Sequence, residues 1–291
     1  MNGENGMSQT GKACELLGLP TDSRLLIFNI DDFGMCYTTV ESGMRCMQEG
    51  VASSCTVMVP CPWGRYALEV LKNNPEIKFG VHLTAIVDHP YYRWGPLLTS
   101  EPLPSLRDEQ GLFWSSKRID DFMEQVNPEE LEREFRAQID EVLGQGLKPT
   151  HLDSHCHVHT RSERIFDLVV GLAREFGLGV RATREPLIGK VLSSGYPVVD
   201  RPVLDSFDIK TADKPERYFQ MLRELPEGLS EWALHPAQGT AEVKAMTELW
   251  DVRQADYEFC VSEETRQIID EEGIQLASYE QLQVIWKGKS L

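Results

Sequence analysis

Short apolar runs and longer amphipathic segments follow one another along most of the chain. Apolar runs at residues 24–30, 52–60 and 78–84 predict buried strands, because parallel strands that are covered on both faces are apolar throughout. The segments between them, 40–50 and 65–75, have the spacing of amphipathic helices. The same pattern then predicts helices at 127–146, 163–177, 215–225, 248–260 and 262–273, and strands at 147–155, 179–184, 228–236 and 274–279.

Strands that alternate with helices in this way predict a parallel sheet with crossover helices. A closed or nearly closed (β/α) barrel, TIM-like and forming a single domain over residues 14–291, accounts for the number of elements in this length. A doubly wound open sheet is the alternative, but no G-x-G-x-x-G follows the first strand. Residues 1–13 are polar and are expected to form a disordered tail. Residues 88–120 and 185–202 show little periodicity and are expected to be loops.

Composition narrows the classes of partner. The formal net charge is −17, which argues against nucleic acid or an anionic membrane as the main partner. No apolar run reaches the roughly 18–20 residues of a membrane-spanning helix, and residues 1–20 lack the pattern of a secretory signal. The seven cysteines include no C-x-x-C pair, so free thiols in a reducing compartment are expected. Together these features predict a cytoplasmic protein.

Ionisable side chains gather where the predicted strands end. In a βα barrel the C-terminal ends of the strands converge on one mouth, where active sites lie. Several separate strands therefore deliver polar groups to a common place, and stability alone would have favoured apolar residues there. The residues in question are Asp31, Asp32, His82, Asp153, His155, Arg181, Arg184 and His235.

The densest group is THLDSHCHVHT at 150–160, which holds four of the seven histidines. Read as a strand, it points His151, Asp153, His155, His157 and His159 to one side and Cys156 to the other, where the cysteine would pack. Read as a helix, it would put His151, His155 and His159 on one face, but the surrounding alternation favours the strand. Side chains on one face of a strand are about 6.6 Å apart, so only one or two of these residues can bind the same ion.

A carboxylate and two imidazoles from different strands make a plausible site for one divalent ion. Asp32, His82 and His155 supply that set, with room for water. Asp31, next to a ligand, is placed to take a proton from water as general base. His235, which arrives from another strand, is placed to protonate a leaving amine as general acid. This reading predicts metal-assisted hydrolysis.

Four segments in this order resemble the YdjC-like carbohydrate deacetylases, such as the chitooligosaccharide deacetylases. They are NIDDFG (29–34), GVHLT (80–84), PTHLDSHCHVH (149–159) and ALHPA (233–237), and the resemblance spans about residues 24–285. It implies a distorted (β/α) barrel that uses a divalent metal to remove the acetyl group from an N-acetylated mono- or oligosaccharide. It also implies a homodimer, because members of the family are commonly dimeric.

The resemblance assigns roles residue by residue. The metal triad falls on Asp32, His82 and His155, the base on Asp31 and the acid on His235. Four further residues are expected around this set. Asp153 would orient a neighbour, Arg184 would hold Asp31 or bind substrate, and His157 and His159 would support ligands or meet substrate. The ion stays open between zinc, which suits two imidazoles and a carboxylate, and magnesium, with which the family is linked.

Three other functions compete with this reading. A metal-dependent phosphoesterase on a similar barrel would use more carboxylate ligands and a second ion. A glycosidase needs two carboxylates placed across the scissile bond, which adjacent Asp31 and Asp32 fit poorly. A non-catalytic protein that binds metal and sugar is the remaining alternative.

Overall fold

A parallel sheet forms the centre of the structure, a computed structural model that describes residues 11–289. The hydrogen-bonded order is β7-β6-β3-β2-β1-β9-β8, and β10 also pairs with β1. A separate two-stranded sheet joins β4 to β5. The strands are β1 (Arg24–Phe33), β2 (Ser54–Val57), β3 (Phe79–Leu83), β4 (Ile86–Val87), β5 (Trp114–Ser115), β6 (His151–Ser154), β7 (Gly179–Val180), β8 (Leu204–Asp205), β9 (Gly228–Leu234) and β10 (Gln275–Leu276).

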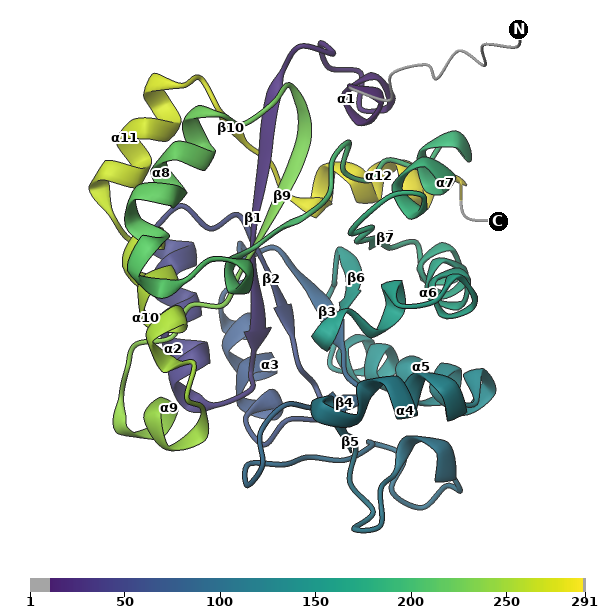
Figure 1. The fold of residues 1–291 in the computed structure, drawn as a ribbon. Coiled ribbons are helices and arrows are strands. Elements are labelled where there is room, and N and C mark those ends of the chain that lie inside the picture. The colour runs from purple at the N-terminus through teal and green to yellow at the C-terminus, as the bar shows by residue number, and fades with distance from the viewer. Residues whose placement is uncertain (1–10, 290–291) are drawn as a thin grey trace, which may run out of the picture.

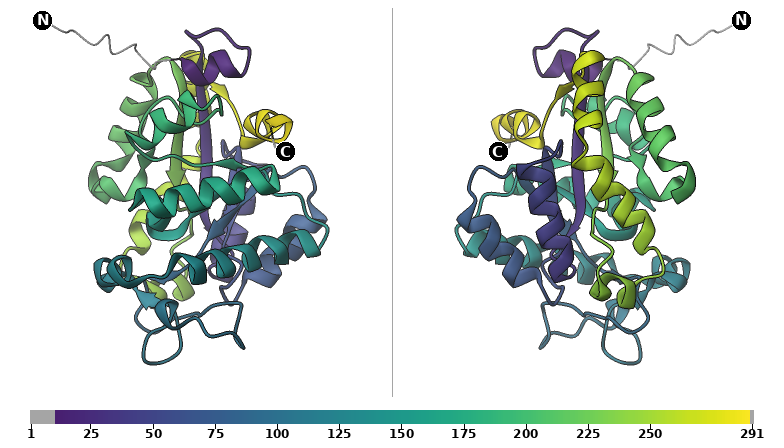
Figure 2. Two further views of the ribbon diagram at one scale, coloured as in Figure 1. Left: turned by 90° about the vertical axis from the view of Figure 1, so that its right-hand side faces the viewer. Right: turned by 90° about the vertical axis from the view of Figure 1, so that its left-hand side faces the viewer.

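Helices cover the curled sheet on both flanks (Figures 1 and 2). The α-helices are α1 (Lys12–Leu16), α2 (Tyr37–Gln48), α3 (Gly64–Asn73), α4 (Ile119–Gln125), α5 (Pro128–Gly144), α6 (Glu163–Phe176), α7 (Leu187–Ser193), α8 (Lys214–Arg223), α9 (Ala241–Met246), α10 (Trp250–Cys260), α11 (Glu263–Glu271) and α12 (Tyr279–Lys289). Short 3₁₀ turns are η1 (Pro104–Leu106), η2 (Ser116–Arg118), η3 (His155–Thr160), η4 (Ser206–Asp208) and η5 (Thr211–Asp213). Among the described residues, no helix combines the length and apolar character needed to cross a membrane.

Strand β1 is the axis of the sheet. Its first seven residues pair with β9 on one side, while the other side pairs first with β10 at Leu25 and Leu26 and then with β2 from Asn29. Every residue of β1 after Arg24 is buried, as the continuous apolar run predicted. Around this axis Phe28, Trp232, Tyr218 and Phe259 pack their rings together, joining β1 and β9 to α8 and α10.

The sheet is a curled half-barrel surrounded by helices, which agrees with the expected distorted barrel, while its closure into a TIM-like barrel stays a prediction. Strands β7 and β8 end the order, and among residues 11–289 they do not pair with each other. Each has only two residues and therefore offers few backbone groups for a closing ladder. The mixed α/β class and the parallel strands with crossover helices agree with the prediction.

Local sequence explains where several helices begin. Asn127 accepts a hydrogen bond from the backbone of Glu129, and Pro128 occupies the first turn of α5. Ser162 caps α6 in the same way, and that helix ends at Gly177 in the left-handed conformation. Thr240 and Ser262 cap α9 and α11. These caps satisfy backbone N–H groups that the helix itself leaves free.

Some elements differ from the pattern. The segment 185–202 contains α7, and the predicted strand 274–279 shrinks to the two residues of β10, after which α12 begins. The strand expected at 179–184 ends at Val180. Residues 1–10 of the expected tail lie outside the described residues, whereas Lys12 and Ala13 belong to α1.

The irregular segment 88–120 lies at the end of the molecule toward which the arrowhead of β1 points (Figure 1). It contains η1, β5 and η2 and leads into α4. The loops that follow the parallel strands open at the same end, so this segment is placed beside the groups that the strand ends deliver.

Candidate active site

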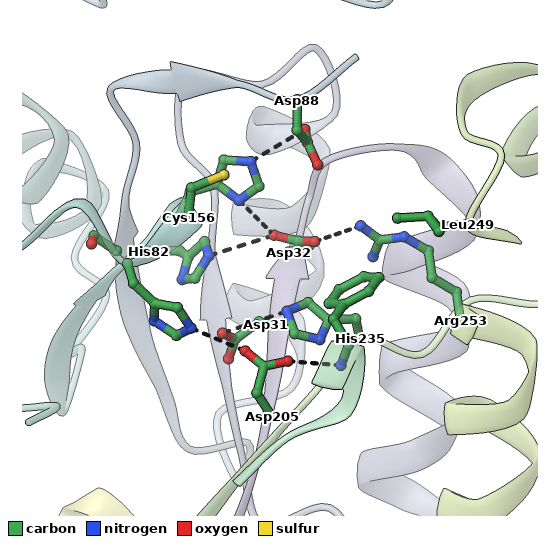
Figure 3. Close-up of a pocket in the computed structure, with 13 residues that line it drawn as sticks. Asp31, Asp32, His82, Asp88, Cys156, Asp205, His235, Leu249 and Arg253 are labelled. Atoms are coloured by element: carbon green, nitrogen blue, oxygen red, sulfur yellow. Dashed lines mark hydrogen bonds and ion pairs between the residues drawn. The ribbon is translucent and has the colours of Figure 1, made fainter. Parts of the chain in front are cut away.

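A cavity of about 220 Å³ opens where the central strands end. Most of its polar lining comes from strand ends and from the turns directly after them. Figure 3 shows how these side chains converge. The lining residues are Asp31, Asp32, His82, Asp88, Ser154, His155, Cys156, His157, Asp205, Phe207, His235, Leu249 and Arg253.

A backbone irregularity brings both aspartates of the first strand to this cavity. Side chains alternate between the two faces of a regular strand, so Asp31 and Asp32 would normally point apart. The pairing of β1 with β2 shifts register between Ile30 and Phe33, and Asp32 has a left-handed φ of 61°. This bulge turns Asp32 into the pocket beside Asp31, and both are buried.

Asp32, His82 and His155 form a compact donor cluster. Asp32 Oδ1 lies 3.0 Å from His155 Nδ1 and 3.5 Å from His82 Nε2. Ligand atoms bind zinc at about 2.0–2.2 Å, so two ligands of one ion can be at most roughly 4.3 Å apart. Both distances satisfy that limit, and one carboxylate with two imidazoles is a common zinc donor set. The three residues expected to bind the ion therefore fit a divalent cation.

Asp153 holds the first imidazole in a defined orientation. Its Oδ1 lies 2.8 Å from His82 Nδ1, so Nε2 is the nitrogen that faces Asp32. Burial alone would lower the pKa of His82, but the carboxylate of Asp153, helped by those of Asp32 and Asp31, raises it to about 9. Without a metal ion, His82 therefore carries a second proton, whose charge balances the nearby carboxylates. That proton must leave before His82 can bind a metal, because a metal binds the neutral imidazole.

The second imidazole has a carboxylate on each side. His155 Nδ1 faces Asp32, and His155 Nε2 lies 3.2 Å from Asp88 Oδ1, an ion-pair contact without hydrogen-bonding geometry. Burial would lower the pKa of His155, but nearby negative groups, including Asp88 and Asp32, hold it well above its usual value. Burial would raise the pKa of Asp88, and His155 instead lowers it to about 2.

Arg181, not Arg184, holds the aspartate expected to act as base. Its guanidinium bonds both oxygens of Asp31 at 2.7 and 2.8 Å and also pairs with Asp153 and Glu231 at 2.8 Å. Burial would raise the pKa of Asp31, but Arg181 outweighs it and holds that pKa below the usual range. Arg184 donates to the carbonyl of Thr160, so the expected contact between Arg184 and Asp31 is wrong. Position 181 lies just past β7, where its side chain reaches under the pocket.

Arg181 also bears on the number of ions. Asp31, His82 and Asp153 form a second compact donor group. The guanidinium already bridges Asp31 and Asp153 from 2.7 and 2.8 Å, so this group has its counter-charge in the protein itself. The group of Asp32, His82 and His155 also has an arginine beside it. Arg253 donates to Asp32 Oδ2 at 2.7 Å and leaves Asp32 Oδ1 facing the two imidazoles.

His235 enters from the end of β9 on the side of Asp31. Its Nε2 lies 3.9 Å from Asp31 Oδ2, and its Nδ1 lies 3.0 Å from the hydroxyl of Ser206. The ring of Phe207 covers the imidazole at a centroid distance of 4.5 Å. Figure 3 shows His235 beside Asp31 and across the pocket from His82. One imidazole nitrogen thus faces the cavity and the other faces the protein.

The histidine cluster does not continue as a strand. Strand β6 ends at Ser154, and the chain turns into η3 with Cys156 and His157 both in the left-handed conformation. The expected alternation past residue 154 is therefore wrong, and Cys156 lines the pocket instead of packing on a far face. His157 also lines the pocket and bonds Asp205 at 3.0 Å.

The other two histidines of the cluster lie behind the pocket. His159 is buried and bridges the Ser154 hydroxyl and the carbonyl of Arg181, so it braces the turn that carries His155. His151 stacks on Tyr279 at a centroid distance of 3.6 Å. Burial lowers the pKa of both rings to about 3, which keeps them neutral.

Several residues in or behind the pocket were not predicted from the sequence. Asp88 and Asp205 each follow or end a strand of two residues, too short to give a periodic signal. Arg253 lies on α10 and Glu231 within β9, where neither position marks a strand end. For Asp88, the short apolar pair before it was the one available signal.

The residues of the pocket lie in a segment that matches a known family. The family model described as YdjC-like protein matches residues 25–271, most of the chain. The chain belongs to the YdjC-like family. The matched segment contains Asp31, Asp32, His82, His155 and His235.

Relatives of this YdjC-like chain include proteins named carbohydrate deacetylase. One from Enterococcus faecalis is 32% identical over 266 residues, which cover 89% of this chain and 98% of that protein. One from Thermoanaerobacter pseudethanolicus is 27% identical over 257 residues, 88% of this chain and 98% of that protein. A solved structure from Enterococcus faecalis, provisionally assigned as a cellobiose-phosphate cleavage protein, superposes with a TM-score of 0.79 at 30% identity. That superposition covers 89% of this chain and 99% of the other, so the fold is shared over nearly its whole length.

Proposed function

We propose that this protein is a metal-dependent hydrolase that removes the acetyl group from an N-acetylated sugar or oligosaccharide. The observation that carries the proposal is the convergence of five side chains on one pocket. The donor cluster of Asp32, His82 and His155 lies beside a buried carboxylate, Asp31, and an imidazole, His235. Relatives named carbohydrate deacetylases indicate the substrate class.

Asp32, His82 and His155 would hold the ion. A divalent cation bound there supplies Lewis acidity, which polarises an acetamide carbonyl and lowers the pKa of a water to about 7. Two imidazoles and a carboxylate suit zinc or another late transition metal better than magnesium, which prefers oxygen ligands. Zinc is therefore the first ion to test, with magnesium as the alternative.

Asp31 and His235 would divide the proton transfers. Asp31 stays ionised at neutral pH because Arg181 stabilises its charge, so it is available to accept a proton from the attacking water. His235 Nε2, which faces the pocket, would give a proton to the sugar nitrogen as the C–N bond breaks. The new bond joins the water oxygen to the carbonyl carbon, and the products are acetate and a free amine.

Around these residues, His157 would contact the sugar and Asp153 would orient His82, while His159 braces the turn behind them. Substrate contact by Arg184 stays a prediction. So does the homodimer implied by the resemblance, which light scattering in solution would test.

The counter-charge supplied by Arg181 favours deacetylation over the phosphoesterase alternative. Two-ion phosphoesterases place metals about 3.5–4 Å apart. Here the second donor group of Asp31, His82 and Asp153 is bridged by a guanidinium. A single ion with an adjacent base and acid is the simpler arrangement for acyl transfer to water.

An acetate-release screen tests the proposal. The purified chain is incubated with N-acetylated mono- and oligosaccharides after chelation and reloading with zinc, magnesium or another divalent ion. We expect acetate and free amine in equal amounts, lost with chelator and restored by one of the metals. Metal-dependent sugar binding without acetate release from any substrate would instead support the non-catalytic alternative.

The change Asp31→Asn separates chemistry from metal binding. The amide keeps the shape of the side chain but removes the base, so kcat should fall by about 10²–10⁴-fold. Metal content, measured by elemental analysis, should stay the same because Asp31 is not in the Asp32 donor cluster. Asp22→Asn, at an exposed position before β1, is the control and should leave both unchanged. Full activity of the Asp31 variant would remove Asp31 as the base.

A further inference from the structure

Arg253 enters the pocket from α10 with hydrogen-bond donors that the protein does not use. It is 2% exposed and lines the cavity together with Asp32, His82 and His155. Its Nη2 donates to Asp32 Oδ2 at 2.7 Å. The Nη1 and Nε atoms are buried, and neither has a hydrogen-bond partner among the residues that the structure describes. Figure 3 shows the guanidinium on the side of Asp32 away from His82.

The other buried arginine of the site has a fully paired guanidinium. Arg181 is 0% exposed, and its Nε, Nη1 and Nη2 atoms donate to the carboxylates of Glu231 and Asp31 at 2.7–2.8 Å. A guanidinium has five N–H donors and no acceptor. Arg253 is almost as deeply buried but has a single side-chain hydrogen bond within the described part of the chain. Burying the donors of a charged group without acceptors is costly, so Arg253 is suited to an acceptor that a ligand brings.

The side chains around Arg253 do not supply this acceptor. Asp88 also lines the pocket, but its carboxylate pairs with His155 at 3.2 Å. The ring centroid of Phe207 lies 5.7 Å from Arg253 Cζ, which favours the positive charge but offers no oxygen or nitrogen acceptor. Leu249 is apolar. Phe207 and Leu249 are 36% and 51% exposed, so a ligand can displace them from the guanidinium without opening the core.

The position of Arg253 indicates which atom of a substrate would accept the hydrogen bond. Its partner Asp32 belongs to the donor cluster, and the proposed base Asp31 and acid His235 line the same cavity. An acetyl group has to lie among these residues for them to act on it. The guanidinium therefore borders the acetyl group, and the strong acceptor of that group is its oxygen.

We propose that Arg253 is a catalytic residue that donates a hydrogen bond to the oxygen of the substrate's acetyl group. The inference rests on the proposed deacetylation. When the water oxygen bonds to the acetyl carbon, a water proton passes to Asp31 and the π electron pair of the carbonyl moves onto the acetyl oxygen. The pair returns as the C–N bond breaks and the nitrogen takes a proton from His235. A buried cation beside that oxygen stabilises the charge that develops on it.

The same hydrogen bond is available to the product. The acetic acid that forms ionises to acetate, and a guanidinium binds a carboxylate with strong, charge-assisted hydrogen bonds. The chain should therefore bind acetate in the pocket, with Arg253 as a main determinant of the affinity. Acetate binding gives a readout that does not depend on turnover.

The change Arg253→Lys tests the inference in the metal-loaded chain. Lysine keeps a positive charge for Asp32 but replaces the planar fork of donors by one ammonium. Metal content, measured by elemental analysis, should stay the same. At saturating metal, kcat should fall by about 10²–10³-fold, as after the loss of one donor to a developing oxyanion, and KM should change less. The Kd of ¹³C-labelled acetate, measured by NMR, should rise by about 10–100-fold.

Arg266→Lys is the matched control, because Arg266 is an exposed arginine on the next helix, α11, outside the pocket. It should change none of the three readouts. Arg253→Ala, with its fold checked by circular dichroism, gives a second variant. Guanidinium ion at low concentration should restore part of its kcat and of its acetate affinity, whereas ammonium ion should not.

Wild-type kcat and acetate affinity in Arg253→Lys would overturn the inference, because Arg253 would then only balance the charge of Asp32. A loss of activity that added metal reverses would overturn it for the same reason. A higher KM at unchanged kcat would place the hydrogen bond on the sugar and would also overturn the assignment. Acetate binding through Arg253 in a chain that releases no acetate from any N-acetylated sugar would instead remove the proposed function and keep the anion-binding role of Arg253.

Discussion

Arg181 is the residue on which the charge balance of the pocket depends. It is fully buried and faces the carboxylates of Asp31, Asp153 and Glu231. Its position between three strands explains why a chain with so many acidic groups can bury several of them at one place. Desolvation of those carboxylates would otherwise force them to take up protons.

Replacing this arginine should therefore be costly. Arg181→Met leaves buried carboxylates without a partner, so the free energy of unfolding should fall by about 3–5 kcal/mol. Urea denaturation measures the loss. Arg184→Met removes one hydrogen bond to a backbone carbonyl and should cost only about 0.5–1.5 kcal/mol. Equal effects of the two variants would contradict the different roles that their contacts indicate.

The raised pKa of His82 predicts opposite pH trends for folding and for metal binding. A ring whose pKa rises from 6.5 to about 9 on folding adds stability that is complete below pH 6.5 and is lost as the pH rises to 9. The metal-free protein should therefore lose stability to urea over this window. Zinc affinity, measured by competition with a chelator, should rise over the same window because the proton must leave first.

The change Asp153→Asn tests whether the carboxylate of Asp153 causes the raised pKa of His82. Without the carboxylate that contributes most to raising the pKa of His82, both trends should move to lower pH. An unchanged pH profile in this variant would show that another group controls the titration.

At the scale of elements, local backbone geometry decides which side chains meet. The bulge at the end of β1 turns Asp32 into the pocket, and the turn η3 separates His155 from the histidines after it. Gly80 on β3 leaves room for a neighbouring ring, because a Cβ at this position would lie 2.6 Å from the imidazole of His151. The His151 ring of β6 can lie against β3 only when a side chain is absent at position 80.

The segment 88–120 contributes Asp88 to the site. Asp88 contacts the nitrogen of His155 that faces away from Asp32, much as Asp153 contacts the far nitrogen of His82. Partners of this kind orient metal ligands, and their loss typically lowers metal affinity by about 10–100-fold. Asp88→Asn should weaken zinc binding by that factor in equilibrium dialysis. Glu109→Gln, in the same segment but exposed, should not. Equal affinities for the two variants would exclude this role for Asp88.

At the scale of the whole molecule, the pocket joins elements that are distant in the sequence. The donor cluster ties β1 to β3 and to the turn after β6, while Arg253 and His235 add α10 and β9. An ion bound to three of these elements would cross-link the sheet. Ligands that bind only the folded state stabilise it by RT ln(1 + c/Kd), where c is their free concentration, so the gain grows with the logarithm of that concentration.

One equivalent of metal should therefore raise the unfolding temperature of the metal-free chain. At a free concentration 100 times Kd the gain is about 2.7 kcal/mol, which calorimetry detects as a higher midpoint. Elemental analysis should find one ion per chain, because Arg181 already bridges the second donor group. Asp32→Asn should abolish the shift. Two ions per chain would contradict the single-site arrangement and revive the phosphoesterase alternative.

By itself, the sequence determined the class of the fold and the members of the donor cluster. Apolar runs predicted most of the central strands, because a buried parallel strand must be apolar along its length. Polar residues at the ends of those runs predicted that Asp31, Asp32, His82, His155 and His235 would meet, and they line one pocket. Strand ends of a parallel sheet meet at one edge whatever the details of its curvature.

Tertiary structure decided what pattern and spacing do not encode. Whether the sheet closes depends on β7 and β8, each two residues long: the pattern predicted a longer strand around β7 and none at β8. The choice of Arg181 over Arg184 depends on which arginine is close enough to Asp31, a relation between residues 150 positions apart. Asp256 of α10 accepts hydrogen bonds from Lys214 of α8 and from the backbone of His235, although both charged residues look like ordinary surface positions until packing buries them. Such contacts arise from the three-dimensional arrangement of elements, so only the folded chain reveals them.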